Sequence, residues 1–138
     1  MQYFTNLNVM VQDYSPDIIG HVDLIKRHNR GNQFFSETEE WYKALVMTSL
    51  DIIQQSNCIL EVNTGGIIRK TSCSLYPSEW ILHECLKRNI PITVNSDSHK
   101  PEDVNGYFHE ISIILKNIGF TSIMIFTQRG WIEHSIIS

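Results

Sequence analysis

Apolar and polar residues follow two periodic patterns along this chain, one typical of strands and one typical of helices. Short apolar runs rich in β-branched residues predict strands at residues 17–20, 58–63, 92–95 and 122–126. Apolar residues that recur at helical spacing predict helices at residues 3–13, 36–55, 77–88 and 107–117. Helices that alternate with strands are typical of a mostly parallel sheet, so we expect an α/β fold.

Two of the predicted helices carry sequence signals at their ends. Ser36 is followed by Glu39 three residues later, which is the pattern of a capping box, so the first long helix is expected to begin at Ser36. Gly119 directly follows the apolar stripe of the last helix. A glycine there is typical of a helix end because it adopts the left-handed conformation without steric cost.

Polar clusters follow three of the predicted strands, at residues 20–23, 63–66 and 95–99. Because the carboxyl ends of parallel strands meet at one edge of a sheet, we expect these clusters to lie together in a functional site. Four strands alone make a thin sheet, whereas a closed barrel of parallel strands needs about eight strands and about 250 residues. We therefore expect an incomplete unit.

The first and third clusters contain candidate metal ligands. Asp97 and His99 lie two residues apart, so on an extended segment a carboxylate oxygen and an imidazole nitrogen can converge on one cation. His21 also falls directly after a strand, and Asp23 could orient its imidazole through the second ring nitrogen. The alternative is that His21 and His99 are hydrogen-bonded polar residues at strand ends, which is common in α/β proteins.

The second cluster has features of a phosphate-binding turn. Gly65 and Gly66 could turn backbone N–H groups toward an anion, Arg69 could bind two phosphate oxygens, and Lys70 could offer a point charge. The alternative is an ordinary solvated loop. Glu61 points away from its apolar neighbours within its strand, so it either reaches the same cleft or has a structural role.

The composition narrows the classes of partner. The 138 residues suit one domain, and a net charge of -4 gives no field that would attract nucleic acid or an anionic membrane. A basic run at residues 26–30 either adds charge near the first cluster or forms a solvated loop.

The three cysteines lack a Cys-x-x-Cys pair, which argues against a disulfide framework. Without a signal-peptide pattern or an apolar run near the roughly 20 residues that span a bilayer, we expect a cytoplasmic protein.

Read in order, four motifs resemble the later motifs of the PHP superfamily of metal-dependent phosphoesterases, nearest to its histidinol-phosphatase branch. They are Gly-His-Val-Asp (20–23), Leu-Glu-Val-Asn-Thr-Gly-Gly (60–66), Tyr-Pro-Ser (76–78) and Ser-Asp-Ser-His (96–99). The resemblance runs through nearly the whole chain. It implies a distorted (β/α)7, TIM-like barrel that binds up to three divalent cations (Mn, Zn or Fe). It also implies hydrolysis of a small phosphomonoester, L-histidinol phosphate, to L-histidinol and phosphate in histidine biosynthesis.

The resemblance also implies roles for individual residues. His21 matches the histidine of the family's Gly-His-x-Asp motif, and Asp97 and His99 match its Asp-x-His motif, so all three would be metal ligands. Asp97 or His99 would also take part in catalysis by helping to move the proton. Arg69 lies at or near the position of a phosphate-binding arginine in the family, and would bind the substrate.

The chain departs from the family pattern in one respect. The opening His-x-His motif, the next histidine and glutamate motif, and the histidine ahead of the Gly-His-x-Asp strand have no counterpart. The resemblance therefore implies that residues 1–138 form a single partial PHP domain, the C-terminal part, without the His-x-His half. Three alternatives stay open: a truncated enzyme that self-associates or pairs with the missing half, an inactive remnant, and a PHP phosphoesterase of other specificity.

Overall fold

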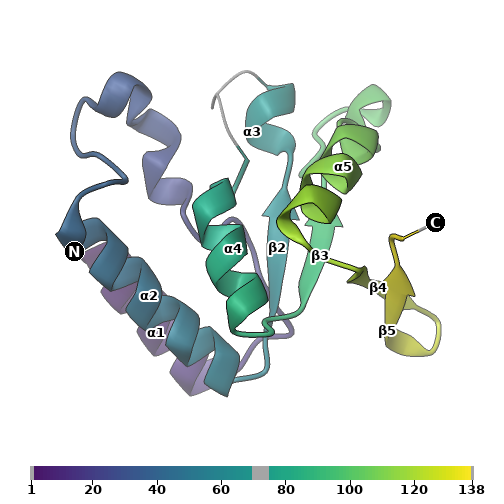
Figure 1. The fold of residues 1–138 in the computed structure, drawn as a ribbon, viewed down its shortest axis with the longest axis horizontal. Coiled ribbons are helices and arrows are strands. Elements are labelled where there is room, and N and C mark those ends of the chain that lie inside the picture. Colours follow the sequence, from purple (N-terminus) through teal and green to yellow (C-terminus); the bar gives the residue numbers. More distant parts are fainter. Residues whose placement is uncertain (1, 70–74, 138) are drawn as a thin grey trace.

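The computed structural model describes residues 2–69 and 75–137 (Figure 1). The helices are α1 (Gln2–Tyr14), α2 (Glu40–Gln55), the short α3 (Gly65–Ile68), α4 (Glu79–Lys87) and α5 (Phe108–Ile118). The strands are β1 (Ile18–Ile19), β2 (Ile59–Asn63), β3 (Ile92–Asn95), β4 (Ser122–Thr127) and β5 (Gly130–Ser135). Short 3-10 helices cover η1 (Leu24–His28), η2 (Arg30–Asn32) and η3 (Pro101–Asp103). Every helix and strand that the periodicity predicted is present.

β1, β2 and β3 form a three-stranded parallel sheet in that order. Leu60 of β2 pairs with Ile19 on one side and with Ile92 on the other. At the carboxyl ends, Asn63 pairs with Asn95. The predicted α/β fold with a parallel sheet is therefore confirmed, and the polar clusters that follow these strands lie at one edge of it.

β4 does not join this sheet, so the expectation of a fourth parallel strand was wrong. It pairs antiparallel with β5 in a separate two-stranded sheet, with Phe126 opposite Trp131 near the turn. In Figure 1 this hairpin lies on the β3 side of the parallel sheet. β5 was not predicted because Glu133 and His134, both exposed, interrupt its apolar residues. Pairing with β4, rather than an apolar run, makes this segment a strand.

The helices cover one face of the parallel sheet. Leu60 and Val62 of β2 are fully buried in the same core as residues of α1, α2, α4 and α5. Because side chains alternate along a strand, Glu61 and Asn63 point to the opposite face. In Figure 1, α4 and α5 lie in front of the sheet and α1 and α2 lie side by side near its β1 edge. The sheet thus has one apolar face under helices and one polar face.

Of the two helix ends that carried sequence signals, one lies where it was predicted and the other does not. Gly119 ends α5 with a φ of 115°, as expected. α2, however, begins at Glu40 rather than Ser36. The Glu39 carboxylate does accept the Ser36 N–H at 2.7 Å, but the backbone of Glu39 is extended, so the half-formed capping box closes a turn ahead of the helix.

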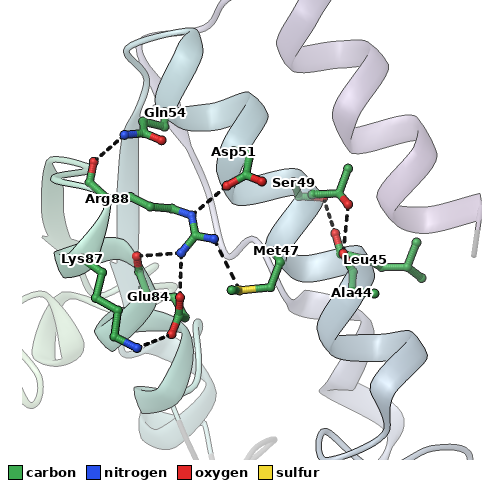
Figure 2. Close-up of polar contacts among 10 residues, drawn as sticks. Ala44, Leu45, Met47, Ser49, Asp51, Gln54, Glu84, Lys87 and Arg88 are labelled. Atoms are coloured by element: carbon green, nitrogen blue, oxygen red, sulfur yellow. Dashed lines mark hydrogen bonds and ion pairs between the residues drawn. The ribbon is translucent and has the colours of Figure 1, made fainter.

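A polar network joins α2 to α4 (Figure 2). The Arg88 guanidinium donates to Asp51 of α2 at 2.9 Å and to Glu84 of α4 at 2.6 Å. Gln54 of α2 donates to the Arg88 carbonyl at 2.9 Å. Lys87 pairs with Glu84 at 2.6 Å, and together with Arg88 it lowers the pKa of the Glu84 carboxyl by hydrogen bonding. These contacts fix the spacing of the two helices at their exposed side.

Cys58 and Cys85 are buried and are free thiols. Burial raises the pKa of the Cys85 thiol to about 12. Both therefore act as small core residues. Cys73 and the phosphate-binding candidate Lys70 lie outside the described residues. Within the described ranges, no helix combines the length and the apolar character needed to cross a bilayer.

Candidate functional site

The loops that follow β1, β2 and β3 enclose two adjacent hollows at the carboxyl edge of the sheet. One of about 600 Å³, here called the polar cleft, is lined by Glu61, Asn95 and Phe108 among others. The other, of about 330 Å³ and here called the cationic hollow, is lined by His21, Leu24, Arg27, Arg69, Tyr76, Asp97 and His99. His21 and Asp97 line both. The hollows therefore share a wall, and His21, Arg69, Asp97 and His99 each border at least one of them.

The backbone of His21 is held in a strained conformation directly after β1. Its φ is 30°, in the left-handed region that non-glycine residues rarely adopt. Its N–H donates to Glu61 Oε2 at 2.8 Å, and the Tyr3 hydroxyl donates to the neighbouring Val22 carbonyl at 3.2 Å. The contacts fix the main chain and leave the half-buried imidazole on the wall between the two hollows.

Arg69 brings Asp97 and His99 together. Its Nη2 donates to Asp97 Oδ2 at 2.7 Å, and its Nη1 donates to the Asp97 carbonyl and lies 3.1 Å from His99 Nδ1. His99 Nδ1 is also 2.9 Å from the Asp97 carbonyl. Because a carbonyl only accepts and a guanidinium only donates, one proton cannot satisfy both of these Nδ1 contacts. When Nδ1 donates to the carbonyl, Nε2 is left with a free lone pair.

Gly65 makes this arrangement of Arg69 possible. A Cβ on Gly65 would lie 2.6 Å and 2.8 Å from the two terminal guanidinium nitrogens of Arg69, and 2.8 Å from the Ser96 carbonyl. The glycine therefore lets Arg69 fold back over it toward Asp97. The expectation that its N–H faces an anion was wrong, because Gly65 opens the short helix α3 and its N–H donates to Asn63 Oδ1 at 2.9 Å.

Glu61 lies on the polar face of β2, at the base of the polar cleft. Its Oε2 accepts hydrogen bonds from the His21 N–H at 2.8 Å and from Asn63 Nδ2 at 3.0 Å. Its Oε1 accepts from Asn95 Nδ2 at 2.9 Å. The carboxylate therefore connects the ends of all three parallel strands, which is a structural role, and it lines the polar cleft, whereas Arg69 of the predicted phosphate-binding turn lines the cationic hollow.

Asp23 does not orient the imidazole of His21, so that expectation was wrong. It is fully buried, and its Oδ2 binds Lys26 Nζ at 2.7 Å and the Ser78 N–H at 3.0 Å, while its Oδ1 has no hydrogen-bond partner in the part of the chain that the structure describes. Burial raises the pKa of Asp23, and the charge of Lys26 opposes that shift. Lys26 also donates to the Ser78 hydroxyl and lies over the ring of Tyr76. The cluster anchors η1 to the start of α4.

Arg27 lines the cationic hollow, although the sequence did not single it out. Two roles had stayed open for the whole basic run at residues 26–30. A 3-10 helix has three residues per turn, so Leu24 and Arg27 share one face of η1, and both line the cationic hollow. Lys26 lies on another face and is buried. A 3-10 periodicity in the residues after His21 would have been the signal, but a helix of five residues is too short to reveal it.

The donor types of His21, Asp97 and His99 suit a divalent cation such as Zn or Mn. Their arrangement does not form a ready site. The residues that the structure describes contain no group of three His, Cys, Asp or Glu side chains placed to hold a metal ion. Arg69 lies against both Asp97 and His99 instead. Metal binding by these three residues therefore stays a prediction.

The chain is similar in sequence to parts of longer proteins that are named histidinol-phosphatase. The chain is 30% identical over 97 residues to the "Histidinol-phosphatase" of Bacillus subtilis, covering 70% of this chain and 35% of that protein. It is 26% identical over 126 residues to the "Probable histidinol-phosphatase" of Schizosaccharomyces pombe, covering 89% of this chain and 40% of that protein. No protein-family model matches the chain.

A solved structure shares the fold. The crystal structure of the "putative histidinol phosphatase hisK" from Listeria monocytogenes matches with a TM-score of 0.66 at 22% identity, over 78% of this chain and 42% of that one. The chain thus spans well under half the length of the proteins it matches. It shares an α/β fold with part of one of them, and recognisable sequence with parts of proteins named histidinol-phosphatase.

Proposed function

We propose that this chain is the C-terminal part of a phosphomonoesterase of the histidinol-phosphatase type, which hydrolyses L-histidinol phosphate to L-histidinol and phosphate. The observation that carries the proposal is the cationic hollow, which Arg27 and Arg69 line together with His21 and His99 at the carboxyl edge of a parallel sheet. Paired guanidinium groups suit the oxygens of a phosphate. The names of the similar proteins support the substrate.

The proposed architecture is the C-terminal portion of a distorted (β/α)7 PHP barrel. A barrel of this type has helices on the outer face of its sheet and polar residues at the carboxyl edge of its strands. Within the described residues, the sheet has helices on one face and carries Glu61 and Asn63 on the other. We propose that the remaining strands come from a segment with the His-x-His half, or that two copies of the chain associate.

Arg69 has a specific part in the proposed reaction. It is bound to the Asp97 carboxylate, whereas Arg27 has no side-chain partner among the described residues. A phosphate dianion is a stronger bidentate partner than a carboxylate, so substrate would draw Arg69 from Asp97. Asp97 would then be free to accept a proton, and the two arginines would neutralise the charge that develops on the phosphoryl oxygens.

The proposed cofactor is a divalent cation, Mn, Zn or Fe, with His21, Asp97 and His99 as ligands. Such an ion would lower the pKa of a bound water toward neutrality, which supplies the nucleophile. Once Arg69 moves from Asp97 to the substrate phosphate, the Asp97 carboxylate would be free to bind that ion.

Phosphate release from L-histidinol phosphate in the presence of Mn²⁺ or Zn²⁺ tests the proposal. Arg69→Ala removes one charge-stabilising donor and should lower kcat/KM by about 10²-fold or more. Arg129→Ala, a change on the exposed hairpin turn, should leave it unaltered. Absence of phosphate release, both by the chain alone and after addition of the missing N-terminal half, would count against the enzyme.

A non-catalytic remnant is the second candidate, and the hold of Arg69 on Asp97 and His99 favours it. It would bind inorganic phosphate in calorimetric titration without hydrolysing any ester. A phosphomonoesterase of other specificity would instead release phosphate from other esters faster than from L-histidinol phosphate.

A further inference from the structure

The polar cleft contains a buried carboxylate without a cationic partner. Glu61 is only 8% exposed, yet its three hydrogen-bond donors are two amides and a backbone N–H, all neutral. Among the residues that the structure describes, no lysine or arginine forms an ion pair with it. These neutral donors satisfy part of the carboxylate but supply no opposite charge, so a cation that entered the cleft would be stabilised by Glu61.

The hydrogen bonds of Glu61 leave room for one more donor. A carboxylate has about four lone-pair positions, two on each oxygen. Among the described residues, Oε2 already accepts from His21 and Asn63, whereas Oε1 accepts only from Asn95. One position on Oε1 is therefore free, which fits a single N–H of an ammonium group and excludes a chelating, two-oxygen contact.

The rest of the cleft adds an apolar wall. Val104, directly after η3, and Phe108, the first residue of α5, line it and are 60% and 37% exposed. Exposed apolar side chains beside a buried carboxylate suit a ligand that has a carbon skeleton or ring next to its positive charge.

The charges of the two hollows are opposite. The cationic hollow has Arg27 and Arg69, and its carboxylate Asp97 is already paired with Arg69. The polar cleft has Glu61, and no lysine or arginine of residues 2–69 or 75–137 lines it. Because His21 and Asp97 line both hollows, the two lie next to each other at the carboxyl edge of the sheet.

We propose that Glu61 is the specificity-determining residue of this site. It would bind the protonated amine of a dipolar substrate, a phosphate ester of an amino alcohol, while Phe108 packs against the carbon skeleton. The phosphate would lie between Arg27 and Arg69. This inference rests on the proposed phosphatase function and deepens it, because it selects amine-bearing esters over neutral ones.

Binding of two alcohols without phosphate isolates the amine contact. L-Histidinol carries the amine, and 3-(imidazol-4-yl)propan-1-ol is the same molecule without its amino group. In calorimetric titration the unaltered chain should bind L-histidinol at least about 10-fold more tightly, since a charge-assisted hydrogen bond has about twice the strength of a neutral one. No binding of either alcohol, or equal affinity for both, would overturn the proposal.

Glu61→Gln should abolish that preference. The Asn95 amide can rotate to offer its oxygen to the new amide group, so the hydrogen-bond network is retained while the charge is lost. Affinity for L-histidinol should fall about 10-fold and affinity for the amine-free alcohol should stay the same. Glu110→Gln, which removes the same charge from the exposed side of α5, should change neither.

Two further readouts separate the alternatives. If Glu61→Gln weakens both alcohols equally and also weakens Mn²⁺ binding, Glu61 is a metal ligand and the inference fails. Phe108→Ala should weaken both alcohols alike, whereas Phe126→Ala on the hairpin should have no effect; an unchanged affinity in Phe108→Ala refutes the apolar wall.

The two proposals fail in different ways. Amine-selective, Glu61-dependent binding without phosphate release would refute the enzyme and support the binding site. Equal hydrolysis of the phosphates of both alcohols, by the unaltered chain and by Glu61→Gln, would refute the selectivity and support the enzyme.

Discussion

Replacement of Lys26 by methionine should destabilise the chain strongly. The side chains of Lys26 and Asp23 are 5% and 0% exposed and lie 2.7 Å apart, so water cannot take the place of the lost ammonium. Removal of one partner of a buried ion pair costs about 3–5 kcal/mol, because the remaining charge is left uncompensated. Asp23 Oδ1 already lacks a hydrogen-bond partner among the described residues, so Lys26→Met should fall in that range rather than below it.

Urea unfolding followed by circular dichroism measures this loss. With an m value of about 2 kcal/mol/M, a destabilisation of about 4 kcal/mol lowers the midpoint by about 2 M. The double variant Asp23→Asn/Lys26→Met removes both charges and should recover at least about 2 kcal/mol of the loss, because a neutral buried pair carries no desolvated charge. The exposed pair of Lys43 and Glu40, 3.9 Å apart, provides the control, and Lys43→Met should cost less than about 0.5 kcal/mol.

Two results would refute this reasoning. A cost below about 1 kcal/mol for Lys26→Met would show that the pair is not desolvated in the folded chain. A double variant as unstable as the single one would show that the lost stability comes from packing of the Lys26 side chain and not from the charge left on Asp23.

Three further predictions concern the packing around the site and the core. Gly65→Ala should lower the free energy of unfolding by about 1–3 kcal/mol, because the new Cβ meets the Ser96 carbonyl at 2.8 Å; Gly20→Ala, whose Cβ would have an ordinary 3.4 Å contact, serves as the control in thermal unfolding. Glu84→Gln should cost at most about 1 kcal/mol at pH 7. Since the folded pKa of Glu84 is lowered, that contribution is present above its unfolded pKa and should vanish in pH-dependent urea titrations as the pH falls through the lowered value; a cost that persists in acid contradicts the ion-pair origin. Leu60→Ala should cost about 2–5 kcal/mol in urea unfolding, and a value near zero would contradict its place in the core.

Local periodicity was sufficient to predict most of the secondary structure. The apolar runs located β2 and β3, and the helical stripes located α1, α4 and α5, because a strand or helix repeats its buried positions at a fixed spacing. The same patterns placed His21, Asp97 and His99 after parallel strands, and the structure brings them to one edge. The role of these residues toward a metal stays a prediction.

Contacts between distant residues were decided only by the tertiary structure. Asp23 binds Ser78 rather than His21, and Arg69 crosses Gly65 to reach Asp97, 28 residues further along the chain. β5 forms only because β4 lies beside it. No periodic pattern records such pairings, since they depend on which side chains the packed helices bring within hydrogen-bonding distance.

The sequence by itself therefore determined the order of helices and strands and the edge where polar groups gather. The tertiary structure decided how charge is divided at that edge, with Arg27 and Arg69 in one hollow and Glu61 in the next. The physical reason is that repeating patterns follow from backbone geometry, whereas the pairing of each charge follows from burial and proximity across the folded chain.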